Sequence, residues 1–262
     1  MPSTFFGWVG FLAREYGGLF LRGTGVTLLI AITGTLLGFL LGLLVAIART
    51  IELSPHAGVV KRALVKLLHA ALGIYIEVFR GTPMIVQAMV IYYGALQYLN
   101  IDMPRLVAAI FIVSINTGAY MAEIVRGGII SIDRGQFEGA MSIGMNHFQT
   151  MLRVVIPQVM RNILPSVSNE FVINIKDTSV LNVIGVTELY YFAGIIKRQN
   201  FQTFQTYLVI CVLYFILTFA VTRLLRWLEK KLDGKSNYII FGSQSDLQAE
   251  IRISQEEGRT SL

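Results

Sequence analysis

TGVTLLIAITGTLLGFLLGLLVAIA, residues 24–48, is a run without a charged side chain that ends at Arg49. A helix needs about 20 such residues, each rising about 1.5 Å, to cross the hydrocarbon core of a bilayer. The run is therefore predicted to be a membrane-spanning helix. Within it, Gly34, Gly38 and Gly42 recur at every fourth position, which puts them on one face where another helix can approach closely. We predict a packing role for these glycines.

The composition extends this interpretation to most of the chain. Of its 262 residues, 54% are hydrophobic and only 15% are charged, whereas soluble domains carry about 25% charged residues. This excludes an ordinary soluble enzyme and predicts an all-α membrane protein in a lipid bilayer. The net charge of +6 reflects the enrichment of Lys and Arg in cytoplasmic loops, so no nucleic acid partner is expected. The single cysteine, Cys211, allows neither a disulfide nor a CxxC metal site, and no metal is expected.

Further apolar runs complete a set of about five predicted spans, at about 24–48, 83–99, 104–125, 162–186 and 206–222. The stretch 59–79 is apolar on one side only, because Arg62, Lys66 and Glu77 recur in it at helical spacing. We predict that it is an amphipathic helix lying on the cytoplasmic surface. The alternative, a span over 67–79, is too short and would bury Glu77.

The distribution of Lys and Arg predicts the orientation. Segments 49–80, 126–161 and 223–235 are much richer in these residues than the other segments between spans. Cytoplasmic loops carry such an excess, so an external N-terminus and a cytoplasmic C-terminus are predicted. The predicted organisation is an external N-terminal segment 1–23, a transmembrane domain 24–225 with a long cytoplasmic loop at 126–161, and a cytoplasmic basic segment and tail at 226–262.

The fourth predicted span is unusually polar, since it contains Glu170, Lys176 and Asp177. Each charge near a helix centre costs about 2.5–3.5 kcal/mol to insert, so other helices or a wet cavity must shield this segment. Ser166, Glu170, Asn174 and Asp177 are spaced so that they share one helix face. Two interpretations stay open: a polar lining of a translocation path, or an ion-pair network between helices that only stabilises the bundle.

Other polar residues of the predicted spans have separate roles. Lys176 lies off the polar face, and we predict that it pairs with another helix or a carbonyl group. The segment can also be two half-helices with a break near residues 176–178, which would expose backbone dipoles to a polar substrate. Gln87 either lines the path or is buried against a neighbouring helix. Glu123 and Arg126, three residues apart, are predicted to form an ion pair at the inner membrane edge.

Three blocks of sequence together resemble one protein family. They are EVFRGTPMIVQ at 77–87, NTGAYMAEIVRGGIISIDRGQFEGAMSIGM at 116–145 and LPSVSNEFVINIKDTSVLNVIGVTEL at 164–189. In combination they resemble the permeases of polar amino-acid ABC importers, the histidine, glutamine and arginine type, with a glutamine-like character. The resemblance covers most of the chain between Glu77 and Leu189.

The resemblance implies a type I importer fold and a set of partners. Two permease subunits, the same chain or a related one, would pack side by side on a dimer of ABC ATPase subunits. An extracytoplasmic binding protein would deliver the amino-acid substrate. The resemblance also implies a location in the bacterial cytoplasmic (inner) membrane. ATP and Mg would be bound by the ATPase.

The family couples to its ATPase through a cytoplasmic helix, and the stretch from Gln136 to Phe148 resembles it. The family pattern Glu-Ala-Ala, followed after a gap by Gly, corresponds to Glu138-Gly139-Ala140 and Gly144, so Gly139 departs from the pattern. We predict one short helix here, on which Phe137, Met141, Met145 and Phe148 are anchors at helix-in-groove spacing. The predicted coupling residues are Gln136, Phe137, Glu138, Ala140, Met141, Gly144, Met145 and Phe148.

The sequence contains no GxxxxGK[ST] motif, whose backbone amides and lysine would cradle ATP phosphates. We therefore expect a transport subunit that is not an enzyme and holds no cofactor, working by ATP-driven alternating access. An ion-gradient-driven secondary amino-acid transporter is the alternative, although such proteins usually carry internal repeats, and none is found here. A Glu170–Asn174–Asp177 face suits a cationic or amide amino acid, unless specificity lies entirely in the binding protein.

Overall fold

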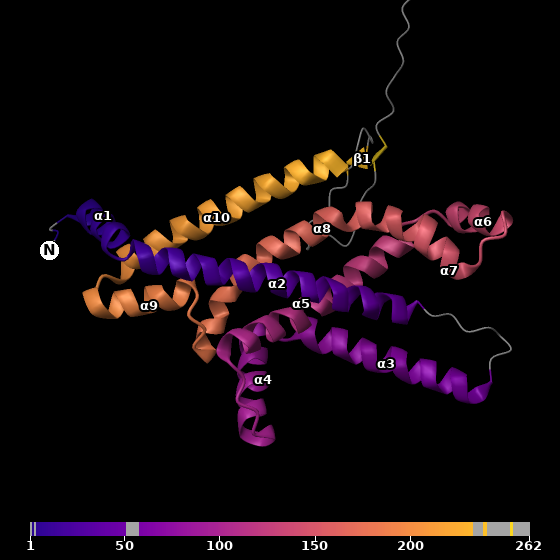
Figure 1. The fold of residues 1–262 in the computed structure, drawn as a ribbon, viewed down its shortest axis with the longest axis horizontal. Helices are drawn as coiled ribbons and strands as arrows, with labels where there is room; N and C mark the ends of the chain where they lie inside the picture. Colours follow the sequence, from indigo (N-terminus) through magenta and orange to yellow (C-terminus); the bar gives the residue numbers. More distant parts are fainter. Residues whose placement is uncertain (1, 3, 51–57, 233–237, 240–251, 254–262) are drawn as a thin grey trace, which may run out of the picture.

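The computed structural model describes residues 2, 4–50, 58–232, 238–239 and 252–253. Most helices run lengthwise through an elongated bundle, and α4 stands across it (Figure 1). The α-helices are α1 (Phe5–Glu15), α2 (Gly17–Arg49), α3 (Val59–Gly81), α4 (Met84–Leu99), α5 (Arg105–Ile130), α6 (Arg134–Ser142), α7 (His147–Thr150), α8 (Ile156–Asp177), α9 (Leu189–Asn200) and α10 (Thr203–Leu232). The π-helical turn η1 (Met151–Val155) and the 3-10 helix η2 (Thr178–Ile184) flank α8, and the short strands β1 (Tyr238–Ile239) and β2 (Arg252–Ile253) pair antiparallel.

Helices α2, α5 and α10 are each long and apolar enough to cross a membrane. The segment containing α8 passes the same test together with α9, beyond a bend of 55°. Helix α4 is apolar but has 16 residues, about 24 Å at 1.5 Å per residue, which is shorter than a hydrocarbon core of about 30 Å. Four of the predicted spans therefore fall in segments of spanning length, and the fifth, 83–99, coincides with this short helix.

The glycine-rich face of α2 forms the most extensive helix–helix contact of the described residues, against α5. Gly34, Gly38 and Gly42 are all buried there. A Cβ atom at Gly38 would lie 2.7 Å from the Cβ of Thr117, closer than real Cβ atoms approach one another. The predicted packing role is thus confirmed, because only glycine lets the two backbones come this close.

Helix α3 differs from the sequence prediction. Its middle lies beside the end of α2, where His69 Nε2 is 3.1 Å from the carbonyl oxygen of Ala48. Its second half enters the bundle, since the Tyr75 hydroxyl donates a 2.7 Å hydrogen bond to the Ile115 carbonyl, near the middle of α5. The prediction that 59–79 lies on the surface is therefore wrong for this half. A tyrosine can be inserted between helices when its hydroxyl finds a partner, and Glu77 stays exposed.

The polar span changes its helix type near the predicted position but bends further along the chain. Helix α8 ends at Asp177 and continues as the 3-10 helix η2, which ends at Gly185 with φ of 78°. The bend to α9 follows. The prediction of a break near residues 176–178 is therefore wrong in position: the α-helix ends there, but the chain bends only at residues 185–188, where Gly185 closes η2. The polar face belongs to the α-helical part.

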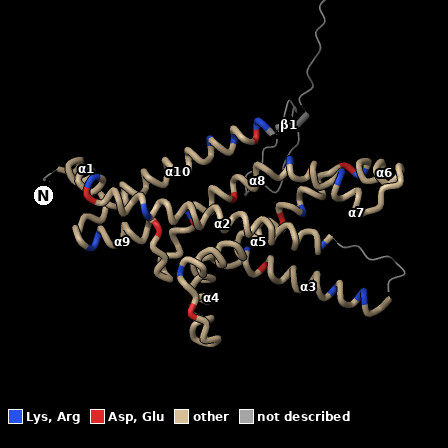
Figure 2. Tube along the Cα trace, in the orientation of Figure 1, with Lys and Arg blue, Asp and Glu red and all other residues tan. Residues whose placement is uncertain are grey.

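The two ends of the bundle differ in what they carry. Helices α1 and α9 lie at one end, and α6 and α7 lie at the other (Figure 1). Charged residues are sparse along α2 and α10 and gather toward helix ends (Figure 2). The predicted external segment 1–23 therefore lies at the end of the molecule opposite α6 and α7, while the assignment of that end to the outside stays a prediction.

Candidate translocation path and coupling segment

Asn174 occupies the centre of a buried network that joins three helices. Its side chain is 2% exposed. Its amide nitrogen donates to the hydroxyl of Thr35 on α2, at 2.8 Å, and to that of Thr117 on α5, at 3.0 Å. The Thr117 hydroxyl also lies 3.2 Å from the Asn174 amide oxygen. This part of the predicted polar face therefore holds α8 against α2 and α5.

Glu170 lies one turn earlier on the same helix and is almost equally buried, at 3% exposed. In the described part of the chain, however, its carboxylate has no hydrogen-bond or ion-pair partner. Asp177 and Arg80 are the charged groups whose fields act on it. An ionised carboxylate in such a place is costly unless a cation or hydrogen-bond donor joins it. Glu170 is thus equipped to receive a ligand that carries one.

The other two members of the predicted face are less enclosed. Asp177, the last residue of α8, is half-buried, and Ser166 is exposed. The four residues therefore differ in environment although their spacing is helical. Asn174 is bonded between helices, whereas Glu170 and Asp177 leave their carboxylates without a hydrogen-bonded partner in the described residues.

Gln87 is buried in a second network, at the break between α3 and α4. Its side-chain nitrogen donates to the carbonyl oxygens of Phe79 and Thr82, each at 2.9 Å. Asn116 on α5 donates to the side-chain oxygen of Gln87, at 2.9 Å, and to the Phe79 carbonyl, at 3.2 Å. Of the two interpretations of Gln87, the geometry supports burial against neighbouring helices.

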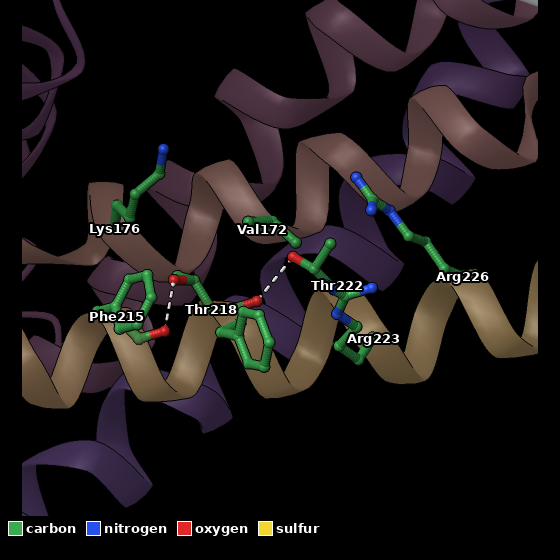
Figure 3. A pocket seen from close by; sticks show the side chains of 8 residues that line it. Val172, Lys176, Phe215, Thr218, Thr222, Arg223 and Arg226 are labelled. Carbon is green, nitrogen blue, oxygen red and sulfur yellow. Dashed lines mark hydrogen bonds between the residues drawn. The ribbon is translucent and has the colours of Figure 1, made fainter.

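Lys176 does not behave as predicted. It is exposed, and it forms no hydrogen bond or ion pair among the described residues. The prediction that it pairs with another helix or a carbonyl group is therefore wrong. The reason is its position on α8: it lines a pocket beside α10, and its ammonium group extends away from that helix (Figure 3).

The predicted pair of Glu123 and Arg126 is present and larger than expected. Arg126 donates to one carboxylate oxygen of Glu123 at 2.8 Å, and Arg49 at the end of α2 donates to the other, also at 2.8 Å. The ion pair therefore ties α2 to α5 near the loop that follows. Sequence spacing identifies the partner three residues away, but Arg49 is distant in sequence and gives no such signal.

The coupling segment is not one helix. Helix α6 ends at Ser142, and Gly144 has a φ of 84°. Met145 donates its backbone N–H to the Ala140 carbonyl and Gly144 donates to the Met141 carbonyl, the pair of bonds that defines a Schellman cap. The prediction of a continuous helix over 136–148 is therefore wrong. Glycine at this position closes the first helix, and Asn146 then caps the short helix α7.

The break divides the predicted coupling residues into two groups. Phe137 packs against the apolar cluster at this end of the bundle, and Ala140 is buried. Met141 and Phe148 are 53% and 73% exposed. Gln136, Glu138 and Gly144 are also exposed, and Met145 is half-buried. An additional residue missed from the sequence, Ile143, is 73% exposed. The segment therefore presents apolar side chains to its surroundings.

The structure and the comparisons together place the chain in a class. Spanning helices, a buried carboxylate without a bonded partner in the described part of the chain, and exposed apolar side chains on α6 and α7 fit a membrane transport subunit. Residues 38–234 match the family model described as the binding-protein-dependent transport system inner membrane component. The chain belongs to this family, as the membrane permease of an amino-acid ABC importer and a multi-pass protein of the bacterial inner membrane.

Individual relatives agree with this assignment. The glutamine transport system permease protein GlnP of Escherichia coli (strain K12) is 37% identical over 217 residues, which cover 82% of this chain and 93% of GlnP. The probable amino-acid permease protein YxeN of Bacillus subtilis (strain 168) is 34% identical over 195 residues, 74% of this chain and 82% of YxeN. Both are permeases by name.

Two solved structures have a similar fold. The crystal structure of an amino acid ABC transporter with histidines aligns with a TM-score of 0.75 and 34% identity, over 88% of this chain and all of that chain. The MetNI methionine ABC transporter aligns with a TM-score of 0.66 at 17% identity, over 83% of this chain and 98% of that chain, and so supports the fold alone. The type I importer fold expected from the sequence is confirmed at this level.

Proposed function

We propose that this chain forms the membrane path through which a polar amino acid, of the glutamine or cationic class, enters the cytoplasm by alternating access. The observation that carries the proposal is Glu170, whose carboxylate is buried within the bundle without a protein partner among the described residues. Every free amino acid carries an ammonium group that can donate to a carboxylate, and arginine or lysine carries a second cation. Charge-assisted hydrogen bonds of this kind are the stronger class.

Asp177 extends the proposed site toward the end of α8. Its charge acts on Glu170, so two acidic groups favour a cation between them. Arg80, from the end of α3, also acts on Glu170 and lies 5.5 Å above the ring of Tyr120. In the proposed cycle, the substrate cation binds close to the Glu170 carboxylate and balances its negative charge, which Arg80 otherwise offsets from a distance.

The proposed partners follow from the family. A second permease subunit, a dimer of ATPase subunits that bind ATP and Mg, and an extracytoplasmic binding protein would complete the importer. We propose that the ATPase contacts the segment from α6 to α7, because Met141, Ile143 and Phe148 are apolar and exposed there. Movement of this segment would reach α5 and α8, between which α6 and α7 are inserted in the chain.

The experiment is uptake into proteoliposomes that contain the permease, its cognate ATPase and its binding protein. Labelled glutamine, arginine, lysine and histidine are compared with and without ATP. We expect ATP-dependent uptake of one of them, which Glu170→Gln and Asp177→Asn reduce or redirect to another amino acid. Glu15→Gln, which removes an exposed carboxylate of α1, is the matched control and should leave uptake unchanged.

Two outcomes would overturn the proposal. Uptake that persists without the ATPase would support the gradient-driven alternative. If neither carboxylate substitution changes the rate or the choice of substrate, the site lies elsewhere and specificity resides in the binding protein.

A further inference from the structure

A pocket of about 250 Å³ lies between α8 and α10, outside the polar network of Asn174. Lys176 of α8 lines one wall, and Arg223 and Arg226 of α10 line the other (Figure 3). Thr218 and Thr222 lie between them, and each donates its hydroxyl proton to a carbonyl of its own helix. The hydroxyl oxygens can still accept hydrogen bonds. Lys176, Arg223 and Arg226 are the charged residues of the lining.

Among the described residues, none of the three cations of this pocket forms an ion pair with a carboxylate. No acidic residue lines the pocket. Arg223 lies 5.0 Å above the ring of Phe219, which orients the guanidinium without neutralising it. Cations beside a membrane-spanning helix are stabilised by an anionic partner.

The wall around the cations is apolar and open. In the most apolar window of α10, only 6% of residues are buried. Phe215 and Phe219, which also line the pocket, are 65% and 51% exposed, and their rings stack with centroids 5.9 Å apart. An occupant of this pocket therefore meets two chemistries at once, an anion-binding edge and a hydrocarbon surface.

The position along α10 matches such an occupant. The arginines follow the apolar part of the helix, and Lys230 and Lys231 continue the basic stretch toward its end. That end points to the same side of the bundle as α6 and α7 (Figures 1 and 2). Basic pockets between membrane helices on the cytoplasmic side are suited to phospholipid head groups.

We propose that the pocket between α8 and α10 is a binding site for an anionic phospholipid. The phosphate is held by Arg223 and Arg226, and an acyl chain lies along Phe215 and Phe219. Val172 and Lys176 of α8 also line the pocket, so the bound lipid contacts both helices. Free phosphate would satisfy the arginines but leave the aromatic wall uncovered, which is why we assign the site to a lipid.

The test uses the full-length permease in its complex with the ATPase, in nanodiscs of phosphatidylcholine with a small fraction of labelled phosphatidylglycerol. We expect the wild type to bind phosphatidylglycerol in preference to labelled phosphatidylcholine. The double variant Arg223→Gln/Arg226→Gln should bind phosphatidylglycerol about 30-fold more weakly, from about 1 kcal/mol per basic residue and 1.4 kcal/mol per tenfold. Binding of phosphatidylcholine should not change.

The matched control removes the same charge from the same helix outside the pocket. Lys230→Gln/Lys231→Gln should weaken phosphatidylglycerol binding clearly less than the arginine double variant, because these lysines do not line the pocket and would not contact the bound phosphate. An equal loss in both double variants, or no preference for phosphatidylglycerol in the wild type, would overturn the proposal. Displacement of the labelled phosphatidylglycerol by inorganic phosphate, at concentrations too low to screen long-range electrostatic attraction, would also overturn the proposal.

The alternative to a lipid is a second copy of this chain packed against the same surface, and a crosslinking experiment tests it. In a Cys211→Ser background, Thr222→Cys places a thiol in the pocket wall. A disulfide between two copies of this variant in the complex would show that the pocket faces the partner subunit and would overturn the lipid assignment. Labelling of the introduced thiol by a lipid-soluble maleimide, without crosslinking, supports it.

Discussion

Asn174 and Glu170 lie one turn apart on α8 and are almost equally buried, yet they have opposite hydrogen-bonding states. Asn174 is bonded to hydroxyl groups of α2 and α5, whereas Glu170 has no bonded partner in the described residues. In a membrane bundle, a bonded polar group holds helices together and an unbonded one is available to a ligand. The difference separates the stabilising part of α8 from the part that we propose contacts the substrate.

The largest expected effect concerns Glu170. Glu170→Gln keeps the shape of the side chain and removes the charge, so a substrate ammonium loses a charge-assisted bond of about 1.5–3 kcal/mol. Transport should fall about 10- to 100-fold, while the thermal stability of the purified complex stays the same or rises because a buried unpaired carboxylate is gone. A parallel loss of stability would show that Glu170 is structural like Asn174.

The next effect tests the scaffold that holds the Asn174 partners. A Cβ at Gly38 would lie 2.7 Å from that of Thr117, so Gly38→Ala should push Thr117 away from Asn174. We expect the free energy of unfolding to fall by about 1–3 kcal/mol, as overpacking does. Gly25→Ala, on an exposed part of the same helix with open space around it, should be neutral or stabilising. Unfolding in mixed detergent micelles measures both.

Asn174→Ala addresses the network itself. The loss of the interhelical bonds should lower the free energy of unfolding by about 1–2 kcal/mol, the upper part of the range for polar contacts in membranes. A double-mutant cycle with Thr35→Val isolates the bond between the two residues, and a coupling close to zero would contradict the network. Transport per folded molecule should change far less than in Glu170→Gln.

The smallest expected effect lies at the coupling segment. Its measurement distinguishes a variant that blocks substrate passage from one that uncouples the permease from the ATPase. Gly144 has open space around it but a φ of 84°, so Gly144→Ala should cost about 1–2 kcal/mol through backbone strain alone. We expect ATP hydrolysis stimulated by the loaded binding protein to fall severalfold. Gly139→Ala, within α6, should leave it intact, and Glu170→Gln should also retain it. Stimulation that survives Gly144→Ala would show that the Schellman cap is not needed for coupling.

Much of the bundle is predictable because hydropathy and spacing act locally. The packing of the α2 glycines and the pair of Glu123 and Arg126 each follow from residues within a few turns of one another. These features depend on which residues share a helix face and on the free energy of inserting a segment into the membrane, and both are properties of the local sequence.

The remaining features depend on contacts between distant segments. The hydroxyls of Thr35 and Thr117 are single polar groups in apolar helices, and nothing in the sequence aligns them with Asn174. The helix over 136–148 fails as a prediction because the cap at Gly144 depends on a backbone angle that spacing does not reveal. Helix α3 enters the bundle because Tyr75 finds a carbonyl on α5, which amphipathic patterning alone does not indicate.

The most direct test of the central claim is substrate binding to the purified permease–ATPase complex without the binding protein. Equilibrium dialysis would use the labelled amino acid that gives the largest uptake, and compare wild type, Glu170→Gln and Asn174→Ala. The account predicts at least about tenfold weaker binding for Glu170→Gln, the loss of one charge-assisted bond, with near wild-type affinity for folded Asn174→Ala. Equal affinity of wild type and Glu170→Gln would contradict a role of the buried carboxylate in holding the substrate.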